Sequence, residues 1–254
     1  MTDEPVLVRE QVGAVLVLRL NRPAARNALN GELLDQLGLA LVEAEADPAV
    51  ACVVISGTGD RAFCAGMDLA DFAAEGAIQP SAEGMTGFRR FTEGKVTVPI
   101  VGAANATAVA GGFEVLMGCD VVVASTEARF GLPEVKRGLF AAGGGTALAT
   151  RIPLAIALEL TLTGDLIDAG RALALGLVNR VVPPDEVLDT ALALADRIAA
   201  NGPLGLQATK QLVRLAIQGP AEYAAIRTEW QAKVFASDDA REGAAAFIEK
   251  RDPV

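Results

Sequence analysis

The sequence contains no histidine among its 254 residues. Histidine is the side chain best suited to act as a general base near neutral pH. Its absence excludes Ser-His-Asp and Cys-His hydrolases, and it excludes any zinc site that depends on imidazole ligands. Acid–base chemistry in this protein must therefore use Asp, Glu, Lys, Tyr or Cys.

Positive charge is also scarce. The 22 Lys and Arg residues stand against 32 Asp and Glu residues, which gives a formal net charge of −10. Nucleic-acid binding relies on basic side chains that neutralise phosphates, so general binding of RNA or DNA is not expected. A local basic patch remains compatible with this composition.

Cysteines and long apolar runs are few. Cys52, Cys64 and Cys119 make an odd count without metal-ligand spacing, which favours structural thiols in a reducing compartment and predicts no metal site. The apolar runs are short and broken by Gly, Pro or charge, and the first residues, "MTDEPVLVRE", do not resemble a signal peptide. We therefore expect a cytoplasmic protein that neither spans nor binds a membrane.

What is present suits a single α/β domain, because 52% of the residues are hydrophobic. The β-rich stretch "VLVREQVGAVLVLRLNRP" predicts a hairpin that turns around Glu10 to Gly13. Leucines at helical spacing predict a helix from about residue 31 to 46, with Asn30 as N-cap and Asp47-Pro48 as its stop. The β-branched run "ACVVISG" predicts a strand buried on both faces.

Strand and helix patterns alternate in the middle of the chain. We predict a strand in "VPIVGAAN", a helix in "GGFEVLMG" and a strand in "DVVVAS", which indicates a largely parallel α/β core with right-handed crossovers. From about Leu154 the balance shifts to helix, with Gly164, Gly176 and Gly202-Pro203 as breaks. The last part predicts one long helix, a loop at Ser237 to Asp239 and a shorter helix.

One glutamate lies in a stretch that is otherwise small or apolar, "AVAGGFEVLMGCD". If a helix begins at Gly111, the neighbours of Glu114 on its own face are all small or apolar: Ala110, Gly111, Met117 and Gly118. A carboxylate that lacks both water and a partner costs several kcal/mol. Glu114 is therefore exposed after all, paired, or retained for chemistry.

Six segments together resemble the enoyl-CoA hydratase/isomerase (crotonase) superfamily, in the family's order and over nearly the whole chain. They are "NRPAARNALN", "RAFCAGMDL", "GGFEVLMGCDVVVASTEARFGLPEVKRGL", "GGGTALATRIP", "ALELTLTGDLIDAGRALALGLVNRVVP" and "SDDAREGAAAFIEKRDP". The resemblance implies an α/β crotonase (ClpP-like) fold. A repeated ββα spiral core would occupy residues 1–200. A helical region over 201–254, in the same fold unit, would cover the active site and build a homotrimer or homohexamer.

The resemblance also implies an oxyanion hole made of backbone N–H groups, which stabilises enolate-like charge on a thioester oxygen. The positions that match the two donors are Met67 and Gly111. A glycine pair at a helix start allows close approach of a ligand to free N–H groups at the positive end of the helix dipole. Taken alone, Gly111-Gly112 fits an ordinary tight strand-to-helix turn better than an anion site.

Two glutamates match the catalytic positions of family hydratases. The resemblance assigns Glu114 to the attacking water and Glu134, in "FGLPEVKRG", to the proton of the α-carbon. Locally, Glu134 also fits a solvated turn residue or a charge at a helix N-terminus, with Lys136 and Arg137 nearby. Burial and proximity should raise the pKa values of the pair and couple their titration.

The resemblance further implies binding of coenzyme A as part of the substrate, with no metal and no other cofactor. The matching positions are Arg26, Ala28, Ala65, Asp68, Leu69 and Lys250. One departure is Ala70, where many family hydratases carry a lysine near the nucleotide. Gly143 to Gly145 is expected to be a tight backbone crossing near the thioester and not a phosphate cradle.

The function implied is an enoyl-CoA hydratase that adds water across the 2,3 double bond. An isomerase, or a dehydratase acting on a branched, carnitine-like or steroid-derived acyl-CoA, is the nearest alternative. A non-catalytic acyl-CoA-binding or RNA-binding relative is the alternative from another class. The acyl pocket is expected between about Phe72 and Phe91 and in the C-terminal helices, and "FAAEGAIQPSAEGMTGF" has the composition of a mobile loop.

Overall fold

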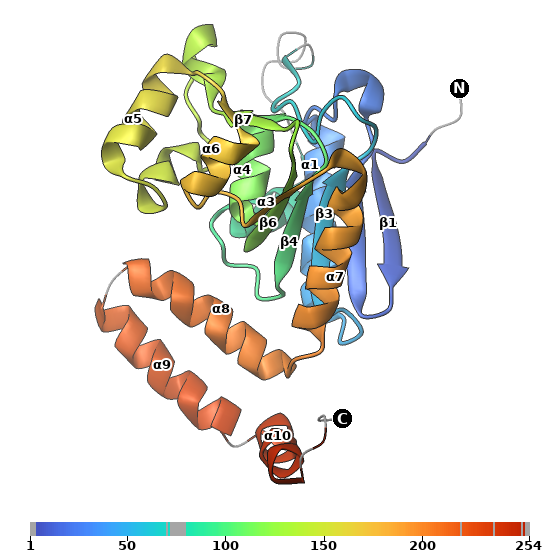
Figure 1. Cartoon of the computed structure of the whole chain (residues 1–254), viewed down its shortest axis with the longest axis vertical. Coiled ribbons are helices and arrows are strands. Elements are labelled where there is room, and N and C mark those ends of the chain that lie inside the picture. Colours follow the sequence, from blue (N-terminus) through green and yellow to red (C-terminus); the bar gives the residue numbers. More distant parts are fainter. Residues whose placement is uncertain are drawn as a thin grey trace.

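The computed structural model describes residues 4–69, 71, 80–218, 220–235, 237–249 and 251. At its centre lies a six-stranded sheet with the strand order β1-β2-β3-β4-β6-β9 (Figure 1). The strands are β1 (Leu7–Val12), β2 (Val15–Leu20), β3 (Cys52–Gly57), β4 (Ile100–Ala104), β6 (Val121–Ser125) and β9 (Arg180–Val182). Only β1 pairs antiparallel; the other neighbours are parallel, as predicted for the core.

The predicted hairpin is formed by β1 and β2, which turn through Gly13 and Ala14 with Val12 opposite Val15. Gly13 has a φ of +58°, a conformation that glycine adopts without steric cost. The side chains of β2 alternate as a strand requires. Val15 and Val17 belong to the core on one face of the sheet, and Leu18 belongs to the core on the other.

Helices cover both faces of this sheet (Figure 1). The helices α1 (Gly31–Ala46) and α3 (Ala82–Thr92) lie on one side, and α7 (Val187–Ala199) packs against β3, β4 and β6 on the other. The predicted strand β3 is buried on both faces, because Cys52 and Val54 face α7 whereas Val53 and Ile55 face α1.

The helix α1 has the predicted bounds and the predicted cap. The side chain of Asn30 accepts a hydrogen bond from the amide of Leu33 at 3.0 Å, an arrangement typically worth about 1 kcal/mol. Leu33, Leu37 and Leu41 are fully buried on one stripe of the helix. Local periodicity and capping thus determine this element.

The helix α3 corrects the expectation of a loop. Residues 82–92 are helical, with the Ser81 side chain accepting from the amide of Gly84 at 3.0 Å. A Cβ at Gly38 of α1 would lie only 1.9 Å from the carbonyl oxygen of Gly84, so glycines permit the close contact of α1 with α3. Residues 72–79 of the expected loop lie outside the described residues.

The expectation of helix beyond Leu154 is only partly right. The helix α5 (Leu154–Thr163) ends at Gly164, as predicted, and α6 (Ala169–Ala174) follows. Between and after them lie the short strands β8 (Ile167–Asp168) and β9, the latter pairing with the edge of β6. Segments this short carry too little local periodicity to be recognised, and only pairing with a distant strand makes them β.

A second, small sheet lies beside the first and supports the candidate site. It has the order β5-β7-β8, with β5 (Ala108–Val109) parallel to β7 (Arg129–Gly131). The helix α4 (Gly111–Gly118) follows β5, so that β4, β5 and α4 repeat the succession of β1, β2 and α1. An isolated bridge joins Cys64 to Ala108 and ties the 61–69 loop to this sheet.

Three helices follow α7: α8 (Pro203–Gln218), α9 (Pro220–Phe235) and α10 (Asp238–Glu249). The helices α8 and α9 lie side by side below the sheet, and α10 lies farther out (Figure 1). The predicted long helix, break and shorter helix are therefore confirmed. None of the helices in the described part of the chain is long and apolar enough to cross a membrane.

All three cysteines are buried and form no disulfide. Burial raises the pKa of the Cys52 and Cys64 thiols to about 12. A thiol with such a pKa is not ionised near neutral pH and is a poor nucleophile. The prediction of structural thiols agrees with this environment.

Candidate active site

Glu114 lies on α4 and is 7% exposed. Its partner is a backbone amide, because Oε1 accepts a hydrogen bond from the N–H of Gly145 at 2.8 Å. A Cβ on Gly143 would lie 2.4 Å from Oε2. Gly143 and Gly145, in the glycine cluster expected to be a tight backbone crossing near the thioester, pack against this carboxylate, and a larger residue at Gly143 would displace it.

The surroundings of Glu114 act on its ionisation in both directions. Burial raises the pKa of the Glu114 carboxyl, and the charge of Glu134 raises it further, whereas hydrogen bonds from the amides of Gly145 and Gly143 lower it. The net shift is upward. A carboxyl with a raised pKa exchanges protons closer to neutral pH and is better suited to general acid–base chemistry.

Glu134 lies on the short 3-10 helix Pro133–Arg137, directly after β7. It is half-buried, and its Oε2 atom accepts no hydrogen bond within the described part of the chain. Burial raises the pKa of the Glu134 carboxyl, and a hydrogen bond from its own backbone amide lowers it in part. The neighbouring Lys136 pairs with Asp165 at 2.7 Å. Glu134 is therefore not the solvated, lysine-paired turn residue that the local sequence also allowed.

The two predicted amide donors lie close together at the start of α4. A Cβ on Gly111 would lie 3.7 Å from the amide nitrogen of Met67, and a Cβ on Gly66 would lie 3.2 Å from the amide nitrogen of Gly111. Among the described residues, neither the N–H of Met67 nor that of Gly111 donates a hydrogen bond. Two free amides at a helix N-terminus can together bind one oxyanion.

The backbone before Gly111 is held in an unusual conformation. Ala110 has a φ of 51° and a ψ of −131°, which alanine rarely adopts and which costs on the order of 1–3 kcal/mol. Its amide donates to the carbonyl oxygen of Gly131 at 2.9 Å, which helps to hold the turn in place. The sequence did not indicate this strain, because nothing local distinguishes Ala110 from an ordinary alanine.

Of the two glycines that open α4, Gly112 serves packing. A Cβ there would lie 2.1 Å from the carbonyl oxygen of Cys64, so no larger residue fits between α4 and the 61–69 loop. At Gly111 the nearest atom to such a Cβ is Leu29 Cδ1 at 3.2 Å. Gly112 therefore permits the close contact of α4 with the 61–69 loop, and Gly111 has the more open surroundings.

The positions that match coenzyme A contacts lie side by side. The amide of Ala65 donates to the carbonyl oxygen of Arg26 at 3.0 Å, and the amide of Asp68 donates to that of Leu29 at 3.0 Å. Arg26 and Leu69 are exposed, whereas Ala28 is buried. Lys250 and Ala70 lie outside the described residues.

Two residues that sequence reasoning missed hold this pair of segments together. Arg22 donates to the carbonyl oxygen of Ala28 at 2.6 Å and to the carboxylate of Asp68 at 2.9 Å. Asn27 is fully buried, and its side chain donates to the carbonyl oxygens of Thr58 and Ala62. Both belong to the quoted motif "NRPAARNALN", but their contacts with residues distant in the sequence gave no local signal.

Metal chemistry has no evident support at this site. In the chain as described, no group of three His, Cys, Asp or Glu side chains is placed to hold a metal ion. The chemistry available from the residues is that of two carboxyl groups and two amide donors, which suits proton transfer next to a stabilised oxyanion.

Comparison with known proteins identifies the family of this chain. The sequence profile of the enoyl-CoA hydratase/isomerase family matches residues 10–254. The chain is 40% identical over 260 aligned residues to the enoyl-CoA hydratase EchA19 of Mycobacterium tuberculosis, covering 98% of this chain and 96% of that protein. It is 38% identical over 248 aligned residues to the carnitinyl-CoA dehydratase of Proteus mirabilis, covering 95% and 94%.

Solved structures that are similar in fold include enoyl-CoA hydratases. The crystal structure of the enoyl-CoA hydratase EchA1 of Mycobacterium marinum matches with a TM-score of 0.92 and 40% identity, covering 99% of this chain and 98% of that one. The enoyl-CoA hydratase of Mycobacterium tuberculosis H37Rv matches with a TM-score of 0.90 and 41% identity, covering 99% and 98%. The chain belongs to the enoyl-CoA hydratase/isomerase family and has its crotonase fold.

Proposed function

We propose that this protein is an enoyl-CoA hydratase that adds water across the 2,3 double bond of an enoyl-CoA thioester. The observation that carries this proposal is the pair of carboxyl groups with raised pKa values, Glu114 and Glu134, together with the free amides of Met67 and Gly111 at the start of α4, the helix that carries Glu114. A single carboxyl would suit an isomerase better, because only hydration requires a group to activate water and another to deliver a proton.

In the proposed reaction, the carboxylate of Glu114 accepts a proton from a water molecule, whose oxygen forms a bond to C3 of the substrate. The electrons of the double bond move toward the thioester oxygen, where the amides of Met67 and Gly111 stabilise the negative charge. The carboxylic acid of Glu134 then donates a proton to C2. These steps add one water molecule to the substrate and leave Glu114 protonated and Glu134 deprotonated. Transfer of that proton from Glu114 to Glu134 restores both groups for the next turnover.

Coenzyme A is proposed to bind as part of the substrate along the paired segments Arg26–Leu29 and Ala65–Leu69. Arg26 and Leu69 are exposed on these segments, and the ion pair of Arg22 with Asp68 supports them. Lys250 is kept as a candidate for a phosphate contact by the resemblance of "EKR" alone. No metal or redox cofactor is required in this scheme.

The test is a panel of 2-enoyl-CoA substrates of increasing chain length, followed by the loss of the conjugated thioester absorbance. We expect hydration of at least one member of the panel. Absence of hydration throughout, with conversion of a 3-enoyl-CoA to its 2-enoyl isomer, would instead favour the isomerase. Formation of the conjugated absorbance from a carnitinyl-CoA substrate would favour a dehydratase, which uses the same groups in reverse.

We also propose that the protein assembles as a homotrimer or homohexamer through the region after Leu204 and acts in the cytoplasm. The helices α8, α9 and α10 extend below the sheet (Figure 1), and Val213 and Ile217 of α8 are exposed. Apolar side chains in such a position are commonly covered by another subunit. Sedimentation showing an active monomer at micromolar concentration would contradict the assembly.

A further inference from the structure

A cavity of about 600 Å³ lies next to the loop that holds Glu114. Gly144, between the two glycines that contact the Glu114 carboxylate, is in its wall, and so is Met117 of α4. Met117 is three residues beyond Glu114, or about 4.5 Å along the helix axis. The cavity therefore borders both the helix and the glycine loop that hold Glu114, and Glu114 itself is not among its lining residues.

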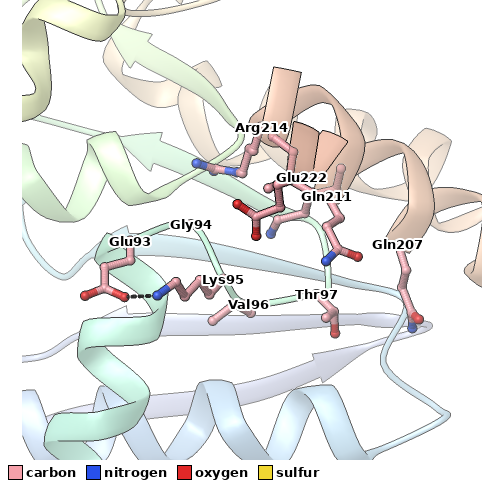
Figure 2. Close-up of a pocket in the computed structure, with 11 residues that line it drawn as sticks. Glu93, Gly94, Lys95, Val96, Thr97, Gln207, Gln211, Arg214 and Glu222 are labelled. Carbon is pink, nitrogen blue, oxygen red and sulfur yellow. Dashed lines mark ion pairs between the residues drawn. The ribbon is translucent and has the colours of Figure 1, made fainter. Parts of the chain in front are cut away.

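The walls of this cavity carry an excess of positive charge. Arg151, Arg214 and Lys95 contribute to its lining, and Glu93 is the acidic residue among the lining residues. Glu93 pairs with Lys95 at 2.7 Å (Figure 2), so this acid does not neutralise either arginine. Within the lining of the cavity, the positive charges of Arg151 and Arg214 therefore have no acidic partner.

Arg214, on α8, lines both this cavity and a smaller cavity of about 250 Å³, which Figure 2 shows. Its guanidinium packs against Gly94, where a Cβ would lie 2.2 Å from Nη1. It donates to Asp120 Oδ1 at 2.7 Å. Contacts with both the core and the 93–97 segment hold this cation in place.

Asp120 cannot neutralise all the cations around it. Its second oxygen, Oδ2, pairs with the amine of Lys210 at 2.7 Å and accepts from the amide of Ile100 at 2.8 Å. Arg151 donates to the carbonyl oxygen of Met117, and within the described residues it forms no ion pair. Two cations, Lys210 and Arg214, therefore share the carboxylate of Asp120, and Arg151 has no carboxylate partner among the described residues.

We propose that this cavity binds an anionic group, and that it receives a carboxylate at the end of the acyl chain remote from the thioester. The second part rests on the proposed hydratase function, and it names the substrate class as enoyl-CoA thioesters with a terminal carboxylate. Guanidinium groups bind carboxylates with charge-assisted, often bidentate hydrogen bonds. The cavity shares no lining residue with the Arg26–Leu29 and Ala65–Leu69 segments, so it is separate from the proposed coenzyme A site.

The test compares matched substrates: enoyl-CoA thioesters of graded length that end in a carboxylate, and the methyl esters of the same acids. For at least one length we expect kcat/KM to be roughly 10- to 100-fold higher for the carboxylate, the range expected for hydrogen bonds to a charged group. Arg214→Gln should bring this ratio near one, and Arg214→Lys should retain part of it. Arg197→Gln, an exposed cation on α7, is the matched control and should leave the ratio unchanged.

A second measurement uses inorganic phosphate to test whether the cavity binds a free anion and not the terminal carboxylate of a substrate. If phosphate raises the unfolding temperature of the protein but not that of Arg214→Gln, while the substrate ratio stays near one, the cavity binds a free anion and the inferred substrate class is wrong. If neither effect is seen while short uncharged enoyl-CoAs are hydrated, the whole inference is overturned and the hydratase function stands. If no enoyl-CoA is hydrated at all, the proposed function fails instead, and the phosphate measurement alone decides whether the anion site exists.

Discussion

The two carboxyl groups of the site are held in different ways. Glu114 lies inside a helix, is 7% exposed, accepts from the amide of Gly145 and has glycine backbone packed against both of its oxygens. Glu134 lies on a short 3-10 turn, is half-buried, and has one oxygen without a hydrogen bond in the described chain. One side chain is fixed by the backbone around it, and the other keeps an unused acceptor atom.

This difference fits a division of labour between two groups of the same chemistry. A carboxylate that must orient a water molecule benefits from a fixed position, because misplaced reacting groups lose the advantage of proximity. A carboxyl that must pass a proton to a carbon atom benefits from an oxygen that is not already engaged. Environment, and not residue type, distinguishes their proposed roles.

The largest expected effect comes from removing either carboxylate. Glu114→Gln and Glu134→Gln keep size and shape, and each should lower the hydration rate by roughly 100- to 10,000-fold, the range for general acid–base catalysis. The double variant should be far less impaired than the product of the single effects, because both groups serve one reaction. Steady-state kinetics with a short enoyl-CoA measures this.

One outcome would contradict the proposed division of labour between Glu114 and Glu134. If Glu114→Gln hydrates at close to the normal rate while Glu134→Gln is inactive, the two carboxylates do not share one water molecule. An isomerase with one working base would then be the better description, and Glu114 would be a structural glutamate paired with Gly145.

The backbone donors should matter next. Met67→Pro removes the N–H without adding charge, and it should lower kcat by roughly 100- to 1,000-fold, as loss of an oxyanion donor does in other enzymes. Met67→Ala keeps the amide and should retain most activity. Equal damage from both variants would show that the side chain of Met67 matters and not its amide.

A smaller loss of hydration rate is expected when only the packing around the Glu114 carboxylate is changed. Gly143→Ala places a Cβ 2.4 Å from Glu114 Oε2, so the carboxylate must move. Displacement by about 1 Å can cost up to roughly 100-fold in rate. Gly205→Ala is the control, because its Cβ would meet no atom within 4 Å, and it should behave as the unmodified protein. A fully active Gly143→Ala would mean that the position of Glu114 is not critical.

The smallest expected effect is on thermal stability. Its dependence on pH compares the environments of Glu114 and Glu134. Burial raises the pKa of Glu114 above the ordinary value of 4.5, so the folded protein binds this proton more tightly than the unfolded chain does. The resulting stabilisation is fully present below pH 4.5 and is lost as pH rises through the raised pKa. Glu114→Gln should therefore unfold at a higher temperature than the unmodified protein at neutral pH.

Thermal unfolding at neutral pH and near pH 4 checks this sign. The advantage of Glu114→Gln should shrink at the lower pH, and Glu127→Gln, an exposed glutamate, should change little at either pH. Glu134→Gln should show a weaker form of the same trend, because Glu134 is less buried. An equal response of both variants would mean that the two environments do not differ in this respect.

Much of the fold could be predicted from local sequence. The bounds of α1 and α4, the cap at Asn30 and the burial of β3 follow from periodicity, capping and β-branched composition, which act over a few residues. The strand β9 and the helix α3 could not be predicted. The first is three residues long, and the second is rich in the glycines that a loop also uses.

The features of the candidate site also fall into those that local sequence indicated and those that only tertiary contacts determine. The apolar neighbours of Glu114 in the sequence indicated a carboxylate that is exposed after all, paired or retained for chemistry, and the match of motifs indicated Glu134, Met67 and Gly111. The partner of Glu114 lies 31 residues away, at Gly145. The strain at Ala110 depends on Gly131, and the anchoring of Asp68 depends on Arg22. None of these contacts has a signature within a single segment.

By itself, then, the sequence determined that this protein has no histidine chemistry, which segments form most of its helices and strands, and that Glu114 lacks polar neighbours on its own helix face. The tertiary structure alone decided which amides are left free near the start of α4, which glycines surround Glu114 and which cations share Asp120. The physical reason is range. Propensity and periodicity act between neighbours along the chain, whereas burial, hydrogen bonds and the electrostatic field at a site depend on atoms brought together only by packing.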